Sequence, residues 1–271
     1  MSLFDAGKAQ QFLRKIPEAP ERGTTETANP LQQNMDTSMT HPIPKTVSVE
    51  PAILYWGTPV VLISTLNENG SSNLAPMSSA FWLGWRCILG LDASSKTTEN
   101  LIRTGQCVLN LPSADQVTNV DRLARLTGSD PVPDAKQMRG YSHGSRKWEI
   151  SGLTPVASET VSPPRAIECP VQMEAVLAAT NGFMADDPVW KVGIRVFEVR
   201  IQRVHVHPAL VMDGTTDRID PDRWNPLIMK FQQFYGLRPR QIHASRLGEI
   251  PEATYLSPDV ARARSESAVR R

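Results

Sequence analysis

The stretch from residue 193 to 207 carries the pattern that most restricts the fold. Phe197, Val199 and Ile201 alternate with polar residues, and the alternation then shifts by one position, with Val204 as the next apolar residue. Successive residues of a strand face opposite sides of its sheet, so one extra residue exchanges the two faces. The shift therefore predicts a long strand with a β-bulge, and bulged, bent strands are common in β-barrels.

Several shorter stretches also predict strands. The β-branched run at 59–66 suits a strand buried on both faces. The Asn69-Gly70 pair predicts a hairpin that returns through 71–75, a strand that Pro76 should end. The other predicted strands are an apolar run with two glycines, which should be bent, and two shorter runs: 81–91, 106–111 and 170–179.

Three helices are predicted from the residues at their ends. Residues 97–104 precede Gly105, and Glu99 and Arg103 are spaced to pair on one face. A capping-box pattern begins a helix over 114–127, and an Asn-Pro pair begins another over 225–235. Many strands with few helices predict a mainly β protein with peripheral helices, built as a closed or split β-barrel.

Composition narrows the classes of function. The 271 residues include 29 Lys and Arg and 28 Asp and Glu, a net charge of +1, which gives no bulk electrostatic reason to bind nucleic acid or a membrane. Cys87, Cys107 and Cys169 are widely spaced and form no C-x-x-C pattern, so we interpret them as free thiols in a reducing compartment. No long apolar run and no secretory signal is present, which favours a cytoplasmic protein.

Two polar turns flank an apolar strand and hold the candidate site. The first, 73–79, sets Pro76 among small residues, so that its backbone amides can face a planar ring; a loop ending a hairpin is the alternative. In the second, 94–101, a helix N-terminus and Lys96 can bind phosphate together, and an ordinary cap with a solvated lysine is the alternative. Four hydroxyl residues surround that lysine: Ser94, Ser95, Thr97 and Thr98.

Four segments, in this order, resemble the flavin reductase-like family of FMN-binding split β-barrels. They are the PVVLIST strand at 59–65, the N-x-x-P-x-S turn at 73–78, the S-K-T-x-x-N-L segment at 95–101 and the Glu-Cys-Pro-Val sequence at 168–171. The resemblance covers residues 58–207. It implies an FMN-binding split β-barrel over 46–212, and a homodimer with the flavin at its interface.

The resemblance also assigns roles to individual residues. Ser95, Lys96 and Thr97 would hold the phosphate of FMN, with Ser94 beside them and Asn100 supporting the turn. The isoalloxazine ring would lie along the first turn, on Asn73, Ala75, Pro76, Met77, Ser78 and Ser79. Trp82 and Trp85 could frame the ring or pack in the core.

The implied function is an FMN-dependent oxidoreductase that moves electrons between a reduced nicotinamide, or another small-molecule donor, and flavin. Many reductases of the family carry a Gly-Asp-His sequence before the late strand, but the corresponding stretch here, 186–193, has no histidine. His143 is the nearest alternative and our candidate catalytic residue. The missing histidine favours a second hypothesis, a non-catalytic FMN-binding electron-transfer protein similar to flavoredoxin.

The remaining segments are predicted from their polarity. Residues 1–45 form an arm that is partly disordered or docks on a partner, and 213–256 a helical extension. Residues 257–271 form a disordered tail, with a helix that docks on a partner as the alternative. His205 and His207 lie two residues apart, but no Cys, Asp or Glu lies near them in sequence. We therefore predict solvated histidines and no metal site.

Overall fold

The strand with the shifted alternation is β12 (Ile194–Val206), and it pairs antiparallel with β11 (Val171–Gly182). Arg203 of β12 pairs with Glu174, whereas Ile201 pairs with the next residue of β11, Ala175, so Gln202 has no partner on that ladder. The predicted bulge is confirmed at Gln202, and it accounts for the change of phase in the sequence.

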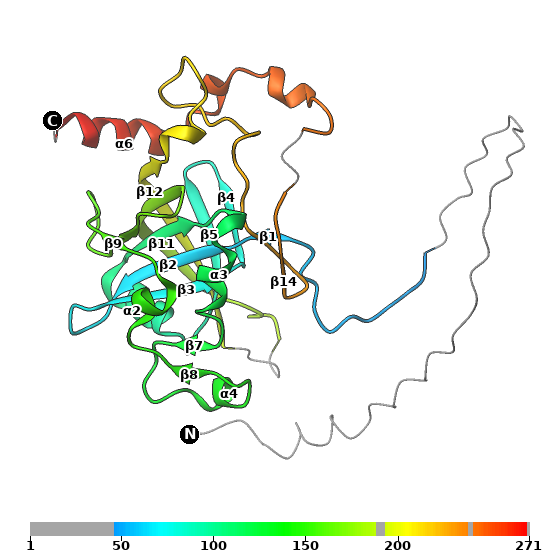
Figure 1. Ribbon diagram of the computed structural model, residues 1–271, viewed down its shortest axis with the longest axis vertical. Coiled ribbons are helices and arrows are strands. Elements are labelled where there is room, and N and C mark those ends of the chain that lie inside the picture. Colours follow the sequence, from blue (N-terminus) through cyan, green and yellow to red (C-terminus); the bar gives the residue numbers. More distant parts are fainter. Residues whose placement is uncertain (1–45, 188–192, 238–240, 270–271) are drawn as a thin grey trace, which may run out of the picture. The chain divides into compact units, whose positions relative to one another are not determined.

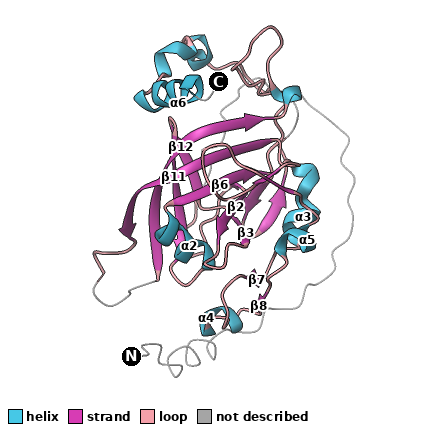
Figure 2. Cartoon of the chain, turned by 90° about the vertical axis from the view of Figure 1, so that its left-hand side faces the viewer, coloured by secondary structure: helices cyan, strands magenta, loops and turns pink. Residues whose placement is uncertain are grey.

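The computed structural model describes residues 46–187, 193–237 and 241–269, and the predicted arm at 1–45 lies outside them. The described residues from 51 onward form one compact unit, whose main sheet has seven antiparallel strands. Figure 2 shows five of these strands, β12, β11, β6, β2 and β3, side by side. The strand order is β3-β2-β6-β11-β12-β5-β4. The other strands of this sheet are β2 (Val61–Leu66), β3 (Ser72–Met77), β4 (Ala80–Leu83), β5 (Arg86–Asp92) and β6 (Gln106–Leu111).

Strand β2 is buried on both faces, as its β-branched sequence predicts. Val61 and Ile63 pack in one hydrophobic cluster with Phe197 of β12, and Leu62 packs in a second cluster with Leu123. Burial of each such side chain contributes about 1.5–3 kcal/mol. Strand β2 therefore contributes side chains to a hydrophobic cluster on each of its two faces. This double burial fixes the position of β2 and of the hairpin that follows it.

Two strand predictions are wrong in detail. The run at 81–91 is a hairpin of β4 and β5 rather than one bent strand, because the chain turns at Gly84, whose φ is +56°. Pro76 does not end its ladder, since β3 continues to Met77, which pairs with Val61. Strand β3 is at the edge of the sheet, where a proline without an N–H group is tolerated.

The helix predicted over 97–104 is confirmed as α2 (Lys96–Thr104). The Ser95 hydroxyl caps it by accepting the Thr98 N–H at 3.1 Å, and Gly105 ends it with φ +66°. The predicted pair of Glu99 with Arg103 is wrong. Glu99 binds the Lys96 ammonium, and Arg103 donates to the carbonyl of Leu66.

The helix predicted over 114–127 is much shorter. A 3₁₀ turn, η1 (Ala114–Gln116), leads into α3 (Val117–Asp121), and the chain then leaves the helix with Arg125 at φ +58°. Strand β7 (Leu126–Thr127) pairs with β8 (Ser142–His143) instead of continuing the helix. The pairing of β7 with β8 therefore overrides the helical pattern of residues 114–127.

The helix predicted over 225–235 is a β-hairpin. Strands β13 (Ile228–Lys230) and β14 (Gln233–Tyr235) are joined through Phe231 and Gln232, which have φ of +45° and +62°. Strand β13 also pairs with β1 (Thr58–Pro59), so β1, β13 and β14 form a separate three-stranded sheet. The predicted helical extension thus holds this hairpin and two 3₁₀ turns, η3 (Arg246–Glu249) and η4 (Glu252–Tyr255).

The C-terminal segment is also corrected. Residues predicted as a disordered tail form α6 (Pro258–Val269), the red helix of Figure 1, which lies against β12. Asp259 accepts from Arg86 Nε at 2.9 Å and ties the helix to β5. The other short elements are α4 (Asp134–Gln137), α5 (Lys147–Ser151), β9 (Pro155–Val156), β10 (Arg165–Ala166) and η2 (Pro208–Leu210).

Two further observations bear on the predicted class of protein. Cys87, Cys107 and Cys169 are buried free thiols, as predicted. Among the described residues, no helix combines the length and the apolar character needed to cross a bilayer.

Candidate functional site

The two polar turns meet at one cleft. Asn73, on β3, donates from its side-chain amide to the Thr97 hydroxyl of α2 at 3.2 Å, so the hairpin and the helix N-terminus are joined directly. A cleft of about 490 Å³ opens at this junction. Most of the predicted cofactor-binding residues line it: Asn73, Ala75, Pro76, Met77, Ser78, Ser95, Lys96 and Thr97.

Three predicted residues do not line the cleft. Asn100 is fully buried and donates to Thr65 Oγ1 at 3.1 Å and to Asn67 Oδ1 at 2.8 Å, which ties α2 to the hairpin turn. The Ser94 hydroxyl donates to Asp92, and the Ser79 carbonyl accepts from the Gly90 N–H. Asn100 thus has a supporting position, whereas direct contact of Ser79 and Ser94 with a cofactor remains a prediction.

Gly128 brings a third segment to the cleft. A Cβ atom at this position would lie 2.5 Å from Asn73 Oδ1 and 3.1 Å from Lys96 Cβ. Only a residue without a side chain lets the loop after β7 approach both turns this closely. Strand β7 and this glycine together form one wall of the cleft, through Leu126, Thr127 and Gly128.

Sequence reasoning missed four cationic residues of the cleft: Arg125, Lys136, Arg139 and Lys147. Lys136 and Lys147 are buried, and Lys147 Nζ donates to Asn73 Oδ1 at 3.0 Å. A lysine in a polar stretch of sequence is predicted to be exposed to solvent. The segments that bury it are distant in the chain and leave no mark on that stretch. The sequence around these two residues carries no local signal of their position.

The cationic residues give the cleft a positive character. Burial, with a smaller effect from the charge of Lys136, lowers the pKa of Lys147 to about 8. Burial also lowers the pKa of Lys136, an effect that Asp92 opposes and Arg139 reinforces. Asp92 is the one carboxylate among the described residues of the lining. The cleft is therefore built for an anionic ligand.

The residues present fit a phosphorylated flavin. The first N–H groups of α2 have no partner within the helix, and the Thr97 hydroxyl and the Lys147 ammonium lie beside them, so a phosphate finds donors here. Ala75, Pro76 and Met77 continue the lining with apolar surface, and Tyr55 and Met229 add more. Apolar surface beside a few fixed polar groups is the usual composition of a cofactor site.

His143 is not brought to the cleft. It lies on β8, its side chain is exposed, and its Nδ1 is 3.2 Å from the Ser129 carbonyl oxygen. No histidine lines the cleft among the described residues. The catalytic role of His143 therefore remains a prediction without support from the geometry. Trp82 and Trp85 pack against the hydrophobic core, the second of the two alternatives for them.

The prediction of two solvated histidines is wrong for His205. Its Nε2 atom lies 2.8 Å from a carboxylate oxygen of Glu174, a residue with no exposed surface. His207 is exposed and accepts the Ala209 N–H at 3.2 Å. Among the described residues, no three His, Cys, Asp or Glu side chains gather as metal ligands would.

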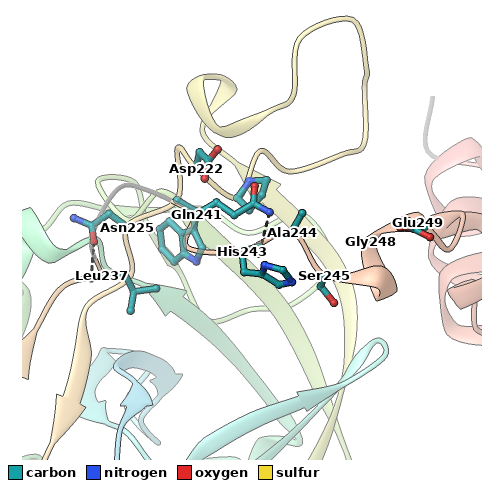
Figure 3. Close-up of a pocket in the computed structure, with 11 residues that line it drawn as sticks. Asp222, Asn225, Leu237, Gln241, His243, Ala244, Ser245, Gly248 and Glu249 are labelled. Atoms are coloured by element: carbon teal, nitrogen blue, oxygen red, sulfur yellow. Dashed lines mark hydrogen bonds between the residues drawn. The ribbon is translucent and has the colours of Figure 1, made fainter. Parts of the chain in front are cut away.

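A second pocket has a volume of about 630 Å³, and Asp222, Asn225 and Gln241 are among its lining residues (Figure 3). Its walls are tied by bonds from the Leu237 N–H to Asn225 at 3.0 Å and from the Gln241 amide to the His243 carbonyl at 3.1 Å. It contains none of the predicted site residues, and its charged residues, Asp222 and Glu249, are exposed. The cleft at β3 and α2 is the stronger candidate site.

The antiparallel sheet, with a cleft lined by cationic residues between strand β3 and the N-terminus of α2, defines a mainly β protein with a candidate ligand site. The chain belongs to the flavin reductase-like family, whose model, "Flavin reductase like domain", matches residues 55–238. Membership implies a flavin-binding site and flavin-related electron transfer. The matched region passes residue 212, where the sequence predicts the domain to end, and includes the β13–β14 hairpin.

Individual relatives agree with this placement. The protein YdfE of Bacillus subtilis (strain 168) is 36% identical over 189 residues, which cover 70% of this chain and 88% of YdfE. Flavoredoxin of Desulfovibrio vulgaris (Miyazaki F) superposes with a TM-score of 0.59 at 19% identity, covering 75% of this chain and 100% of its own. Nitrilotriacetate monooxygenase component B from Bacillus cereus gives a TM-score of 0.58 at 19% identity, covering 74% and 100%. The fold is therefore the split barrel.

Proposed function

We propose that this protein is an FMN-dependent oxidoreductase that moves electrons between a reduced nicotinamide, or another small-molecule donor, and flavin. The observation that carries the proposal is the cleft, in which the apolar residues Ala75, Pro76 and Met77 of β3 meet cationic groups and a helix N-terminus. Its size suits a mononucleotide with a planar ring. Buried free thiols and family membership support a cytoplasmic location.

The chain's residues would bind and orient the cofactor. Ser95, Lys96 and Thr97 would hold the phosphate, and the backbone from Asn73 to Ser78 would face the ring. The flavin itself supplies the electron transfer. Asn100 keeps α2 against the hairpin, so the two halves of the site stay in register.

The test is a spectrum. Freshly purified protein, or flavin-free protein reconstituted with FMN, should show the absorbance bands of bound flavin. Anaerobic NADH or NADPH should then bleach those bands within a catalytic time scale. A protein that stays colourless after reconstitution would overturn the proposal.

One observation favours a second function, a non-catalytic FMN-binding electron carrier. No histidine of the described residues lines the cleft, and the sequence lacks the Gly-Asp-His found in many reductases of the family. A carrier would bind FMN and accept electrons from a protein donor, with no steady-state oxidation of NADH or NADPH. Turnover with added flavin therefore separates the two functions.

We further propose that the protein is a homodimer with the flavin site at its interface. Leu54, Tyr55 and Trp56 form an exposed apolar patch, in which 71% of the Trp56 surface is open. Tyr55 also lines the cleft, so the patch is continuous with the site. A single copy leaves this apolar surface in water, and a second copy that covers it would close the cleft.

Replacing the centre of this patch should break the dimer and release FMN together. A buried interface tryptophan commonly contributes 2 kcal/mol or more, so Trp56→Glu should raise the dimer dissociation constant about 30-fold or more. Light scattering over a dilution series, read beside flavin fluorescence, measures both. Ile242→Glu is the control, since Ile242 is 97% exposed and does not line the cleft. A monomeric wild type that holds FMN at micromolar concentration would contradict the proposal.

A further inference from the structure

The hairpin of β13 and β14 turns through a backbone conformation that its residues disfavour. Phe231 and Gln232, the two residues of the turn, have φ of +45° and +62°. This left-handed region is unfavourable for a residue with a side chain, and hairpin turns that use it usually carry Asn-Gly. Strain of this kind persists only where the surrounding structure holds it, and it is most frequent at ligand sites.

The surrounding structure holds this turn in place. The Phe231 N–H donates to the Tyr55 carbonyl at 2.7 Å, and the Phe231 ring packs edge-on against Trp56, with 4.9 Å between the ring centroids. At the start of the hairpin, Leu227 is buried in a hydrophobic cluster against which Met229 also packs. The turn is therefore clamped on both sides and keeps its strained backbone.

The clamped turn reaches the candidate cleft. Met229 and Gln232 line the cleft, whereas Lys230 does not line it and places its ammonium 4.9 Å from the centroid of the Tyr235 ring. No hydrogen bond joins the Gln232 side-chain amide to another described residue, so its donor and its acceptor are available to a ligand. The hairpin thus gives the cleft a thioether and an amide but no charge, which suits an uncharged planar ring with a polar edge.

We propose that the β13–β14 turn is a ring-binding element of the cleft, in which Met229 packs against the ring and the Gln232 amide bonds the polar edge of the ring. The strained conformation of Gln232 is retained because it brings this amide to the ligand. The identity of the ring rests on the proposed function, in which it is the isoalloxazine of flavin. The imide edge of that ring has an N–H donor and carbonyl acceptors, and a side-chain amide can pair with both.

Two replacements of Gln232 separate ligand binding from backbone strain. Gln232→Met removes the amide but keeps the length of the side chain and the strained backbone. The affinities for FMN and riboflavin should fall together, about 3- to 10-fold, while the thermal midpoint of the flavin-free protein stays unchanged. Gln232→Gly removes the strain as well, so it should weaken both flavins at least as much and raise the midpoint by about 2–4 °C. Fluorescence quenching on flavin-free full-length protein measures the affinities.

Met184→Gly is the matched control for the release of strain. Met184 has a φ of +57° but does not line the cleft. Its replacement should therefore raise the thermal midpoint and leave both flavin affinities as they are in the wild type.

The outcomes distinguish this inference from the proposed function. A Gln232→Met protein with the flavin affinities of the wild type would overturn the inference and leave the function in place. A loss confined to FMN would also overturn it, because riboflavin has the same ring and lacks only the phosphate. A wild type that binds neither flavin would overturn the function, and the inference with it.

Discussion

Glu174→Gln should lower the free energy of unfolding by about 3 kcal/mol at neutral pH. Glu174 has no exposed surface, and its carboxylate accepts from the Glu159 N–H at 2.8 Å, from Thr160 and from His205. Burial alone would raise its pKa, but these hydrogen bonds outweigh burial and hold the pKa at about 2. A neutral amide at this position would turn N–H groups toward donors that need an acceptor.

The same group sets an expected pH dependence. The pKa of Glu174 is about 2 in the folded protein, below the ordinary value of 4.5, so its stabilisation is present in full above about pH 4.5. It is lost as the pH falls from there toward 2. Chemical denaturation between pH 7 and pH 3 should therefore show an acid-dependent loss of stability that is smaller in Glu174→Gln, while the carboxylates of Asp92 and Asp259 keep their own share of it.

The control for this prediction is Glu149→Gln. Glu149 pairs with Arg146 at 3.1 Å, but both side chains are well exposed, and the change should cost less than about 1 kcal/mol. The loss in Glu174→Gln corresponds to roughly 6–12 °C in the thermal midpoint. A Glu174→Gln protein within 1 kcal/mol of the wild type would show that the hydrogen bonds around this carboxylate do not stabilise the fold.

Where local sequence decides the structure, the sequence predicts it well. The ends of α2 follow from Ser95 and Gly105, the hairpin after β2 follows from Asn69-Gly70, and the bulge follows from the phase of β12. In each case the residues on which the prediction rests are the same residues that form the cap, the turn or the bulge. The predicted segments at 73–79 and 94–101 also meet, because Asn73 donates to the Thr97 hydroxyl of α2, although residues 73–77 belong to strand β3 rather than to a turn.

Where distant segments decide the structure, prediction fails. Asn225-Pro226 has the form of a helix start, but β13 pairs with β1 across more than 160 residues of chain, and Leu227 is buried in a cluster that includes Leu62. Lys136 and Lys147 appear as ordinary polar loop residues. Their burial comes from the way the segments around α4 and α5 close over the cleft, which no short window of sequence contains.

Asn73→Asp should give the largest selective effect on FMN binding. The substitution keeps the size of the side chain but places a carboxylate about where the amide oxygen lies, 3.0 Å from Lys147 Nζ. The new charge neutralises the buried lysine and repels the phosphate of FMN. Charges a few ångströms apart in a partly buried site interact by several kcal/mol, so a net loss of about 3 kcal/mol, on the order of 100-fold in affinity, is expected.

The same change should stabilise the flavin-free protein. Lys147 gains a carboxylate as counter-ion. In the wild type the Thr97 hydroxyl accepts from Asn73, and in the variant it can rotate and donate to the new carboxylate. Thermal unfolding without flavin should therefore shift upward while FMN binding falls and riboflavin binding changes little. Asn69→Asp, in the exposed turn of the same hairpin, is the matched control and should leave both flavin affinities unchanged. If Asn73→Asp weakened FMN and riboflavin binding equally, Asn73 would act on the isoalloxazine ring, which both ligands share, and not on the phosphate.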